Sequence, residues 1–226
     1  MKPLLLCTFL LASGVALAAP QAQPPLRDID KVNGGIVAEA GQAYGRLETV
    51  NGGITLGRGA RASGVETVNG GIDAGDDVVL RSASTVNGGI CFGQRGRIDG
   101  DLETVNGSIT LDRGGVVRGK VSTVNGGIGL QASTVEGRVE TVTGDITVGS
   151  GSRVVGGILV EKPKGTLHGL FGKPKIPRIV IGPEAVVEGP MVFEREVKLY
   201  VHASARIGSV TGASVVRYSG ERPPAD

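Results

Sequence analysis

Short runs of alternating apolar and polar residues follow one another along most of this 226-residue chain. Such alternation, rich in Val, Ile and Thr, is typical of β-strands. Each block of about eighteen residues also holds three to five glycines, which oppose helix formation. We therefore predict an all-β chain of short strands. In one representative block, the apolar residues expected to fill the interior are Leu47, Val50, Ile54, Leu56, Ala60, Ala62 and Val65.

One motif, Val-Asn-Gly-Gly-Ile, returns at a nearly constant interval. Counting a serine variant and a final copy that reads Val-Thr-Gly-Asp-Ile, its valines are Val32, Val50, Val68, Val86, Val105, Val124 and Val142. Successive valines are 18, 18, 18, 19, 19 and 18 residues apart. A phase held over half the chain indicates one structural unit per repeat.

Two arrangements of strands fit a glycine-rich repeat. A meander of hairpins is one, because Asn-Gly is a common hairpin turn, but here the turn occurs once per repeat instead of at every strand junction. The other is a single-stranded parallel β-helix, or β-solenoid, with about 18 residues per coil. Coils stacked at about 4.8 Å would make a rod of roughly 30–35 Å from seven motif copies. Crossover chirality favours a right-handed winding.

Stacked coils place equivalent residues in columns. The motif asparagines are expected to form an amide ladder, in which each side chain donates to its neighbour: Asn33, Asn51, Asn69, Asn87, Asn106 and Asn125. Threonines two residues earlier make a parallel column: Thr49, Thr67, Thr85, Thr104, Thr123 and Thr141. We interpret both columns as structural ladders, not binding sites. The glycines are expected to supply positive φ at the corners and to avoid Cβ clashes.

The residue before each threonine is acidic or a serine: Glu48, Glu66, Ser84, Glu103, Ser122 and Glu140. Carboxylates stacked about 5 Å apart repel one another or hold a cation between them. The two serines relieve that repulsion. We interpret this column as a solvated polar face, with a cation site as the alternative.

Composition narrows the function classes. Aromatic residues are 3% of the chain and Trp is absent, so few side chains are available to stack on sugars or bases. The net charge of +2 is too small to indicate nucleic-acid binding. Two cysteines exclude a disulfide scaffold and a cysteine-rich metal site. Repeated glycine motifs without a following helix are turns, not a phosphate loop, so we expect no cofactor.

Residues 1–18 have the three parts of a secretory signal peptide: Lys2, an apolar run, and Ala16-Leu17-Ala18. The run is too short and broken for a good transmembrane span, and none is predicted. Residues 19–29 form a Pro-rich leader. We expect export to the periplasm, the outer membrane or the cell exterior. Loss of Cys7 with the signal peptide would leave Cys91 alone, expected as a small buried residue or, alternatively, a reactive thiol.

The repeat predicts solenoid coils over residues 30–160 and a basic Pro/Gly-rich insertion loop over 161–178. The loop's candidate surface-binding residues are Lys162, Lys164, Phe171, Lys173, Lys175 and Arg178. Such a loop can contact an anionic envelope component such as lipid headgroups, although a solvated excursion is the simpler interpretation. His168 has no second ligand nearby in sequence.

Alternation resumes over residues 179–218, which predicts C-terminal solenoid coils and a cap, and residues 219–226 are expected to form a loose tail. Larger rings at Phe193, Tyr200 and Tyr218 are candidates for covering the open end. A cap matters because uncovered strand edges pair with other chains.

The Val-Asn-Gly-Gly-Ile copies from Val32 to Ile146 resemble the bacterial adhesin-like β-solenoid repeats of unknown function. A shorter stretch, Ile181-Gly182-Pro183-Glu184-Ala185-Val186-Val187-Glu188-Gly189, is similar to the coils of bactofilins, the polymer-forming cytoskeletal proteins. These resemblances imply a β-helix and an association or scaffolding role, with no catalytic residue to carry over. The signal peptide departs from the cytoplasmic bactofilins and favours the envelope.

The sequence thus favours a non-enzymatic exported envelope solenoid that is adhesin-like, structural, or self-associating through its ends. An anionic-surface or lipid-binding module that uses loop 161–178 is the alternative. A polysaccharide-active β-helix enzyme is less favoured, since it needs paired acid and base groups. Its candidates, which we interpret as turn residues, are Asp76, Asp77, Arg81, Asp99 and Asp101.

Overall fold

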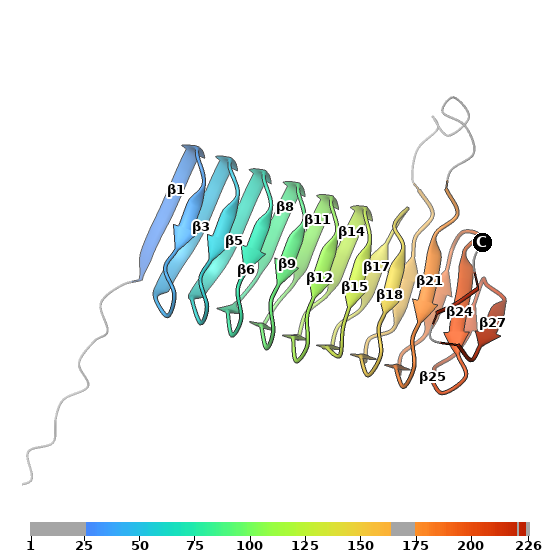
Figure 1. The fold of residues 1–226 in the computed structure, drawn as a ribbon. Helices are drawn as coiled ribbons and strands as arrows, with labels where there is room; N and C mark the ends of the chain where they lie inside the picture. The colour runs from blue at the N-terminus through green and yellow to red at the C-terminus, as the bar shows by residue number, and fades with distance from the viewer. Residues whose placement is uncertain (1–25, 164–174, 221, 225–226) are drawn as a thin grey trace, which may run out of the picture.

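A computed structural model describes residues 26–163, 175–220 and 222–224 of the chain. Within these ranges all regular structure is β, and parallel strands stack as a β-solenoid of about ten turns, roughly 18 residues apart (Figure 1). The predicted all-β parallel solenoid is therefore confirmed. The expected signal peptide, most of the leader, and Lys164, His168, Phe171 and Lys173 lie outside the described residues.

One sheet takes a single strand from every turn and has ten strands within the described residues. In the first seven turns each strand begins at the motif isoleucine, because the preceding glycines form the corner. The strands are β2 (Ile36–Ala38), β4 (Ile54–Leu56), β6 (Ile72–Ala74), β9 (Ile90–Phe92), β12 (Ile109–Leu111), β15 (Ile128–Leu130), β18 (Ile146–Val148), β21 (Arg178–Ile181), β24 (Lys198–His202) and β27 (Val215–Tyr218).

A second sheet, which has seventeen strands in the described part of the chain, wraps the remaining two sides of the tube. Its first three strands run unbroken: β1 (Arg27–Asn33), β3 (Ala43–Asn51) and β5 (Arg61–Asn69). Later turns divide this span at a corner. The short strands before the corner are β7 (Val79–Leu80), β10 (Arg97–Ile98), β13 (Val116–Val117), β16 (Thr134–Val135), β19 (Arg153–Val154), β22 (Val186–Val187) and β25 (Arg206–Ile207).

The strands after that corner lead into the Asn-Gly turn and carry the Thr and Asn columns in the repeat region. They are β8 (Ala83–Asn87), β11 (Leu102–Asn106), β14 (Val121–Asn125), β17 (Val139–Thr141), β20 (Ile158–Val160), β23 (Met191–Phe193) and β26 (Val210–Thr211). The register keeps like residues together: Asn51 pairs with Asn69, and Asn106 with Asn125. The single-residue drift in repeat length is thus absorbed at corners, not in strands.

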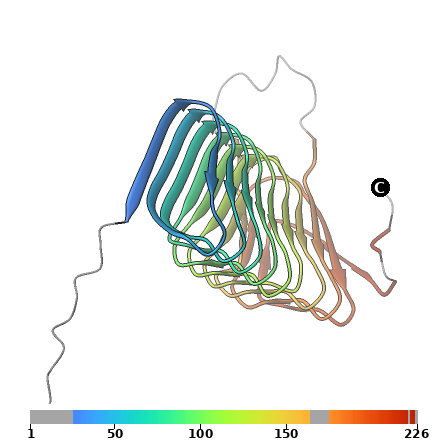
Figure 2. The same cartoon turned by 60° about the vertical axis from the view of Figure 1, so that its left-hand side comes forward.

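The stacked turns enclose a tube (Figure 2). Its interior is filled mostly by columns of small and branched side chains, one from each turn. The clearest column stands at the first buried position of the ten-stranded sheet, where residues are at most 1% exposed: Ile36, Ile54, Ile72, Ile90, Ile109, Ile128, Ile146, Ile179 and Leu199. A narrow tube admits such side chains at every level, and burial of each stabilises the fold by about 1.5–3 kcal/mol. Phe193, Tyr200 and Tyr218 are buried near the C-terminal end.

The basic insertion leaves the solenoid between β20 and β21, close to the boundaries expected from sequence. Two boundaries differ. Strand β1 begins at Arg27, so part of the expected leader belongs to the first turn. Arg178, assigned to the loop, is the first residue of β21 and pairs with Lys198 of β24, because the ladder of the ten-stranded sheet extends one residue further. In the described ranges no helix is long and apolar enough to cross a bilayer.

Positive φ recurs at the corner between the ten-stranded sheet and the short strands. Of the Asn-Gly turns, which all lie in the described residues, only the first has a positive φ, at Gly34. The corner column includes glycines but also four other residues: Asp77, Arg95, Ala132 and Glu184. Left-handed backbone costs an L-residue about 1–2 kcal/mol. Ala132, at φ 40°, bears that strain, while Gly151 of the next turn adopts φ 68° with open space around a would-be Cβ.

A reciprocal pair of substitutions tests this corner. Ala132→Gly is expected to raise the free energy of unfolding by about 0.5–1 kcal/mol, since relief of strain outweighs the added chain entropy of glycine. Gly151→Ala is expected to lower it by about 1 kcal/mol through strain alone. Urea denaturation followed by circular dichroism measures both. A loss of stability in Ala132→Gly would contradict the account.

Candidate functional site

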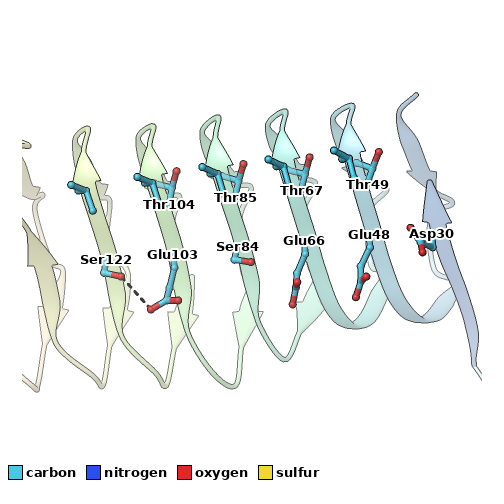
Figure 3. A pocket seen from close by; sticks show the side chains of 15 residues that line it. Asp30, Glu48, Thr49, Glu66, Thr67, Ser84, Thr85, Glu103, Thr104 and Ser122 are labelled. Atoms are coloured by element: carbon cyan, nitrogen blue, oxygen red, sulfur yellow. Dashed lines mark hydrogen bonds between the residues drawn. The ribbon is translucent and has the colours of Figure 1, made fainter. Parts of the chain in front are cut away.

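The outward surface of β3, β5, β8, β11 and β14 carries a groove, and we call this surface the groove face. The groove is shallow, has a volume of about 500 Å³ and crosses several turns (Figure 3). Two outward columns line it, one of Glu and Ser and one of Val, with the buried threonines between them.

The valine column is an exposed apolar stripe. Its central members are 38–40% exposed and follow the rod axis: Val50, Val68, Val86, Val105 and Val124. The prediction that Val50 fills the interior was therefore wrong. Leu47 and Thr49 point inward, so the period of two places Glu48 and Val50 outside. The alternation, applied strictly from Leu47, would have revealed the stripe.

The carboxylates beside this stripe are largely ion-paired. Glu103 lies 2.7 Å from Lys120 Nζ, and that hydrogen bond raises the pKa of the lysine. Further along the rod, Arg46 Nε lies 3.0 Å from Glu48, and Arg138 pairs with Glu140 at 3.4 Å. Three of the four carboxylates in the column are thus ion-paired, and serines separate Glu103 from its carboxylate neighbours on both sides.

Glu66 is exposed and, in the described part of the chain, forms no ion pair, because Gly64 occupies the position that Arg46 holds one turn earlier. Among described residues no group of three or more His, Cys, Asp or Glu side chains is arranged to hold a metal ion.

The asparagine column forms a continuous ladder at the edge of the groove face. Each Nδ2 donates to the Oδ1 of the preceding turn, at 3.1 Å for Asn51 to Asn33 and 2.9 Å for the four later rungs. Thr143 ends the ladder by donating its hydroxyl to Asn125 Oδ1 at 2.8 Å. The altered last motif copy therefore closes the ladder, and all six predicted asparagines are used by it.

The threonine column is buried, with members at most 4% exposed. Its hydroxyls do not bond one another. Instead Thr49, Thr67 and Thr85 each donate to a turn glycine carbonyl of the preceding coil, at 2.8–3.0 Å. Thr104 and Thr123 do the same at 2.9 Å, whereas Thr141 accepts from Gly144 N at 3.0 Å. These hydroxyls satisfy backbone groups and are not available to a ligand.

Close stacking at this corner explains the glycine after each asparagine. A Cβ on Gly70 or Gly88 would lie closer than 3.0 Å to the carbonyl group of the glycine one turn earlier. The next glycine in the motif is less constrained, since a Cβ on Gly71 would meet Gly89 O at 3.3 Å. The glycines here permit close approach of coils, while the positive φ expected of them lies mainly at the other corner.

The base of the insertion loop is tied to the altered motif copy. Asp145, which replaces the second glycine, accepts from Lys175 Nζ at 2.6 Å and from Arg178 N at 2.8 Å. Arg178 also lies 4.9 Å from the centre of the Tyr200 ring and donates to Pro224 O at 2.6 Å. Two of the predicted surface-binding cations therefore hold the fold together. Of the predicted surface-binding set, Lys162 is the described residue left outside that network.

The candidate catalytic carboxylates have turn and ion-pair roles. Asp77 makes a two-point ion pair with Arg95, at 2.7 and 2.8 Å, and this hydrogen bonding lowers the pKa of Asp77. A general acid needs the opposite shift. Asp76 pairs with Arg58 at 2.8 Å and Asp99 with Arg118 at 2.6 Å. Asp101 accepts from Lys120 N at 2.7 Å.

Cys91 is exposed on the outer side of the ten-stranded sheet, so the prediction of a buried residue was wrong. Its neighbours Ile90 and Phe92 point inward, which leaves the cysteine outside. Partial burial of the sulfur, and then the carboxylate of Asp73 in the adjacent strand, raise the pKa of the thiol. The thiol is accessible but weakly ionised.

The ladder can be tested rung by rung. Asn87→Ala removes two amide hydrogen bonds, and Asn33→Ala, at the ladder's end, removes one. At about 0.5–1.5 kcal/mol per bond, Asn87→Ala should lower the free energy of unfolding by about 1–3 kcal/mol and Asn33→Ala by about half as much. Urea titration measures both. An equal or smaller loss at Asn87 would show that the ladder is not cooperative with the fold.

The Cys91 environment predicts slow alkylation. At pH 8 the thiol should react with iodoacetamide more slowly than an unhindered model thiol, since less of it is thiolate. Asp73→Asn removes the carboxylate that raises the pKa and should speed the reaction, whereas Thr55→Ala, one turn further along the same column, should not. An unchanged rate in Asp73→Asn would contradict the electrostatic account.

Comparison with family models, curated proteins and solved structures returned no match.

Proposed function

We propose that this protein is a non-enzymatic, exported envelope solenoid that acts as an adhesin-like scaffold and presents its groove face to another envelope component. The observation that carries the proposal is that neighbouring columns have different roles. The side chains of the Asn and Thr columns are hydrogen-bonded between coils, whereas the adjoining valine stripe is exposed and continuous over several turns. A stripe of that regularity on a rigid rod is a surface built for contact.

The two adhesion-compatible features reinforce each other. The stripe offers apolar area, and the neighbouring ion pairs of Glu48, Glu103 and Glu140 hold the polar rim in fixed positions. An apolar strip with a polar rim is the usual anatomy of an interaction surface. The signal peptide supports export, and the resemblance to adhesin-like repeats supports the adhesive role.

The other candidate functions have less support. Binding of an anionic surface by the loop loses Lys175 and Arg178 to the internal network with Asp145, Tyr200 and Pro224. Hydrolysis of a glycosidic bond would need a carboxyl group with a raised pKa as general acid, and the ion pair with Arg95 lowers the pKa of Asp77 instead. We therefore place the function on the groove face.

Charging the stripe tests the proposal. Val68→Lys/Val105→Lys should reduce co-sedimentation of the purified protein with isolated cell-envelope fragments at least tenfold, because two charges then interrupt the apolar strip. The matched control, Thr55→Lys/Thr110→Lys, adds the same charge to exposed positions of the ten-stranded sheet and should bind like the parent protein.

Circular dichroism and thermal melting should show that both variants remain folded. Equal loss of binding in both pairs would assign the effect to net charge and sink the proposal. Absence of envelope binding by the parent protein would sink it as well.

A further inference from the structure

The two ends of the solenoid carry unpaired strand edges. In the described residues β1 pairs only with β3 and β2 only with β4, and at the other end β27 pairs only with β24. A parallel solenoid has no intrinsic end, since each edge is a template for one more coil. End-to-end association would therefore extend the ladders of both molecules, unless something at the ends opposes it.

Strand β1 places cations where every inner turn of the repeat places small or apolar groups. Lys31 is in register with Thr49, at the head of the buried threonine column. Arg27 is in register with Tyr44, which heads a column continued by Ala62 and Leu80. Of the three inward positions on β1, only Ile29 is apolar.

Lys31 shows how the end differs from the middle. Inner threonines donate to a glycine carbonyl of the coil before them, as Thr49 does to Gly34 O. Lys31 instead donates its Nζ to Gly35 O of its own coil, at 2.8 Å, and remains exposed. A further coil stacked on β1 would enclose this ammonium group, and enclosing an unpaired charge is strongly unfavourable.

The C-terminal end repeats the arrangement. Arg217 of β27 is in register with Val201, whose column is buried through Val201 and Ile181. Its Nη1 donates to His202 O at 3.3 Å, and the residue is exposed. The column that is apolar in every inner turn thus ends in a guanidinium group.

Stacking a further coil on either end would enclose cations in the tube. Arg27 and Lys31 lie on the seventeen-stranded sheet and Arg217 on the ten-stranded sheet, so head-to-tail contact encloses each of them at an inward position without bringing a carboxylate to it. The two carboxylates of β1 stand between these cations: Asp28 accepts from Arg46 N at 2.7 Å, and Asp30 is in register with the outward Glu48. Charges at inward edge positions are a recognised means by which β-proteins avoid edge-to-edge association.

We infer that Arg27, Lys31 and Arg217 close both ends of the solenoid to strand addition, so that the protein acts as a rod of fixed length and meets partners through its flank. End-to-end self-association, expected from the repeat alone, is opposed by these three residues. The inference concerns the ends and does not depend on the proposed adhesive role of the groove face.

The test restores the inner columns at both ends. The purified triple variant Arg27→Ala/Lys31→Thr/Arg217→Val carries residue types that occur further along the same columns, at Ala62, Thr49 and Val201. Its weight-average mass, measured by sedimentation over a concentration series, should rise several-fold, with electron microscopy showing rods longer than one molecule. The parent protein should keep its single-copy mass and length throughout.

The matched control is Arg61→Val/Arg97→Val/Arg113→Ala, which removes the same charge from exposed outward positions away from the ends and should not assemble. If the triple variant does not fold, Arg27→Met/Lys31→Met/Arg217→Met keeps the aliphatic stems and takes its place. A folded end variant that stays single, side-by-side bundles without lengthening, or end-to-end rods of the parent protein would each overturn the inference.

Discussion

Register between successive coils is the constraint on which the rest of this structure depends. Parallel stacking joins each turn to the next by hydrogen bonds, so each side chain lies beside the side chain at the equivalent position of the next turn. At the Asn-Gly corner the coils approach so closely that a Cβ on Gly52 or Gly107 would collide with a carbonyl group of the preceding turn. The glycine permits the short distance between coils, and the asparagine ladder fixes the register of one coil on the next. The threonine hydroxyl donates to the glycine carbonyl at the corner.

Much of the fold could be predicted from the sequence because the repeat length equals the number of residues in one coil. Identical residues at that interval lie at equivalent positions of successive coils, so the members of the Asn and Thr ladders could be named from the sequence. Features that depend on the direction of one side chain were harder. Val50 and Cys91 are apolar or weakly polar residues on outward positions, and composition alone assigns such residues to the interior. Strict counting from Leu47 or Ile90 corrects both.

The departures from the repeat carry most of the specific information. Thr143 stands where an asparagine would continue the ladder, and Asp145 stands where a glycine would stand, and each has a defined partner. Arg178 could be recognised as cationic from sequence but not as a structural residue, since its contacts with Tyr200 and Pro224 join segments far apart in the chain. The same holds for Lys31 and Arg217, whose significance comes from ending a column.

The asparagine ladder also bears on the chemical lifetime of the chain. Asparagine followed by glycine is the sequence most prone to deamidation, in which the backbone nitrogen of the glycine attacks the side-chain carbonyl, and such asparagines are thermolabile sites. Here the nitrogens of Gly52, Gly70 and Gly88 are each held by a carbonyl of the next coil at 3.0–3.1 Å, and the side-chain amides are held by the ladder. Coil stacking thereby holds the two groups that must meet for deamidation, and a coil that unfolds locally would be the first to deamidate.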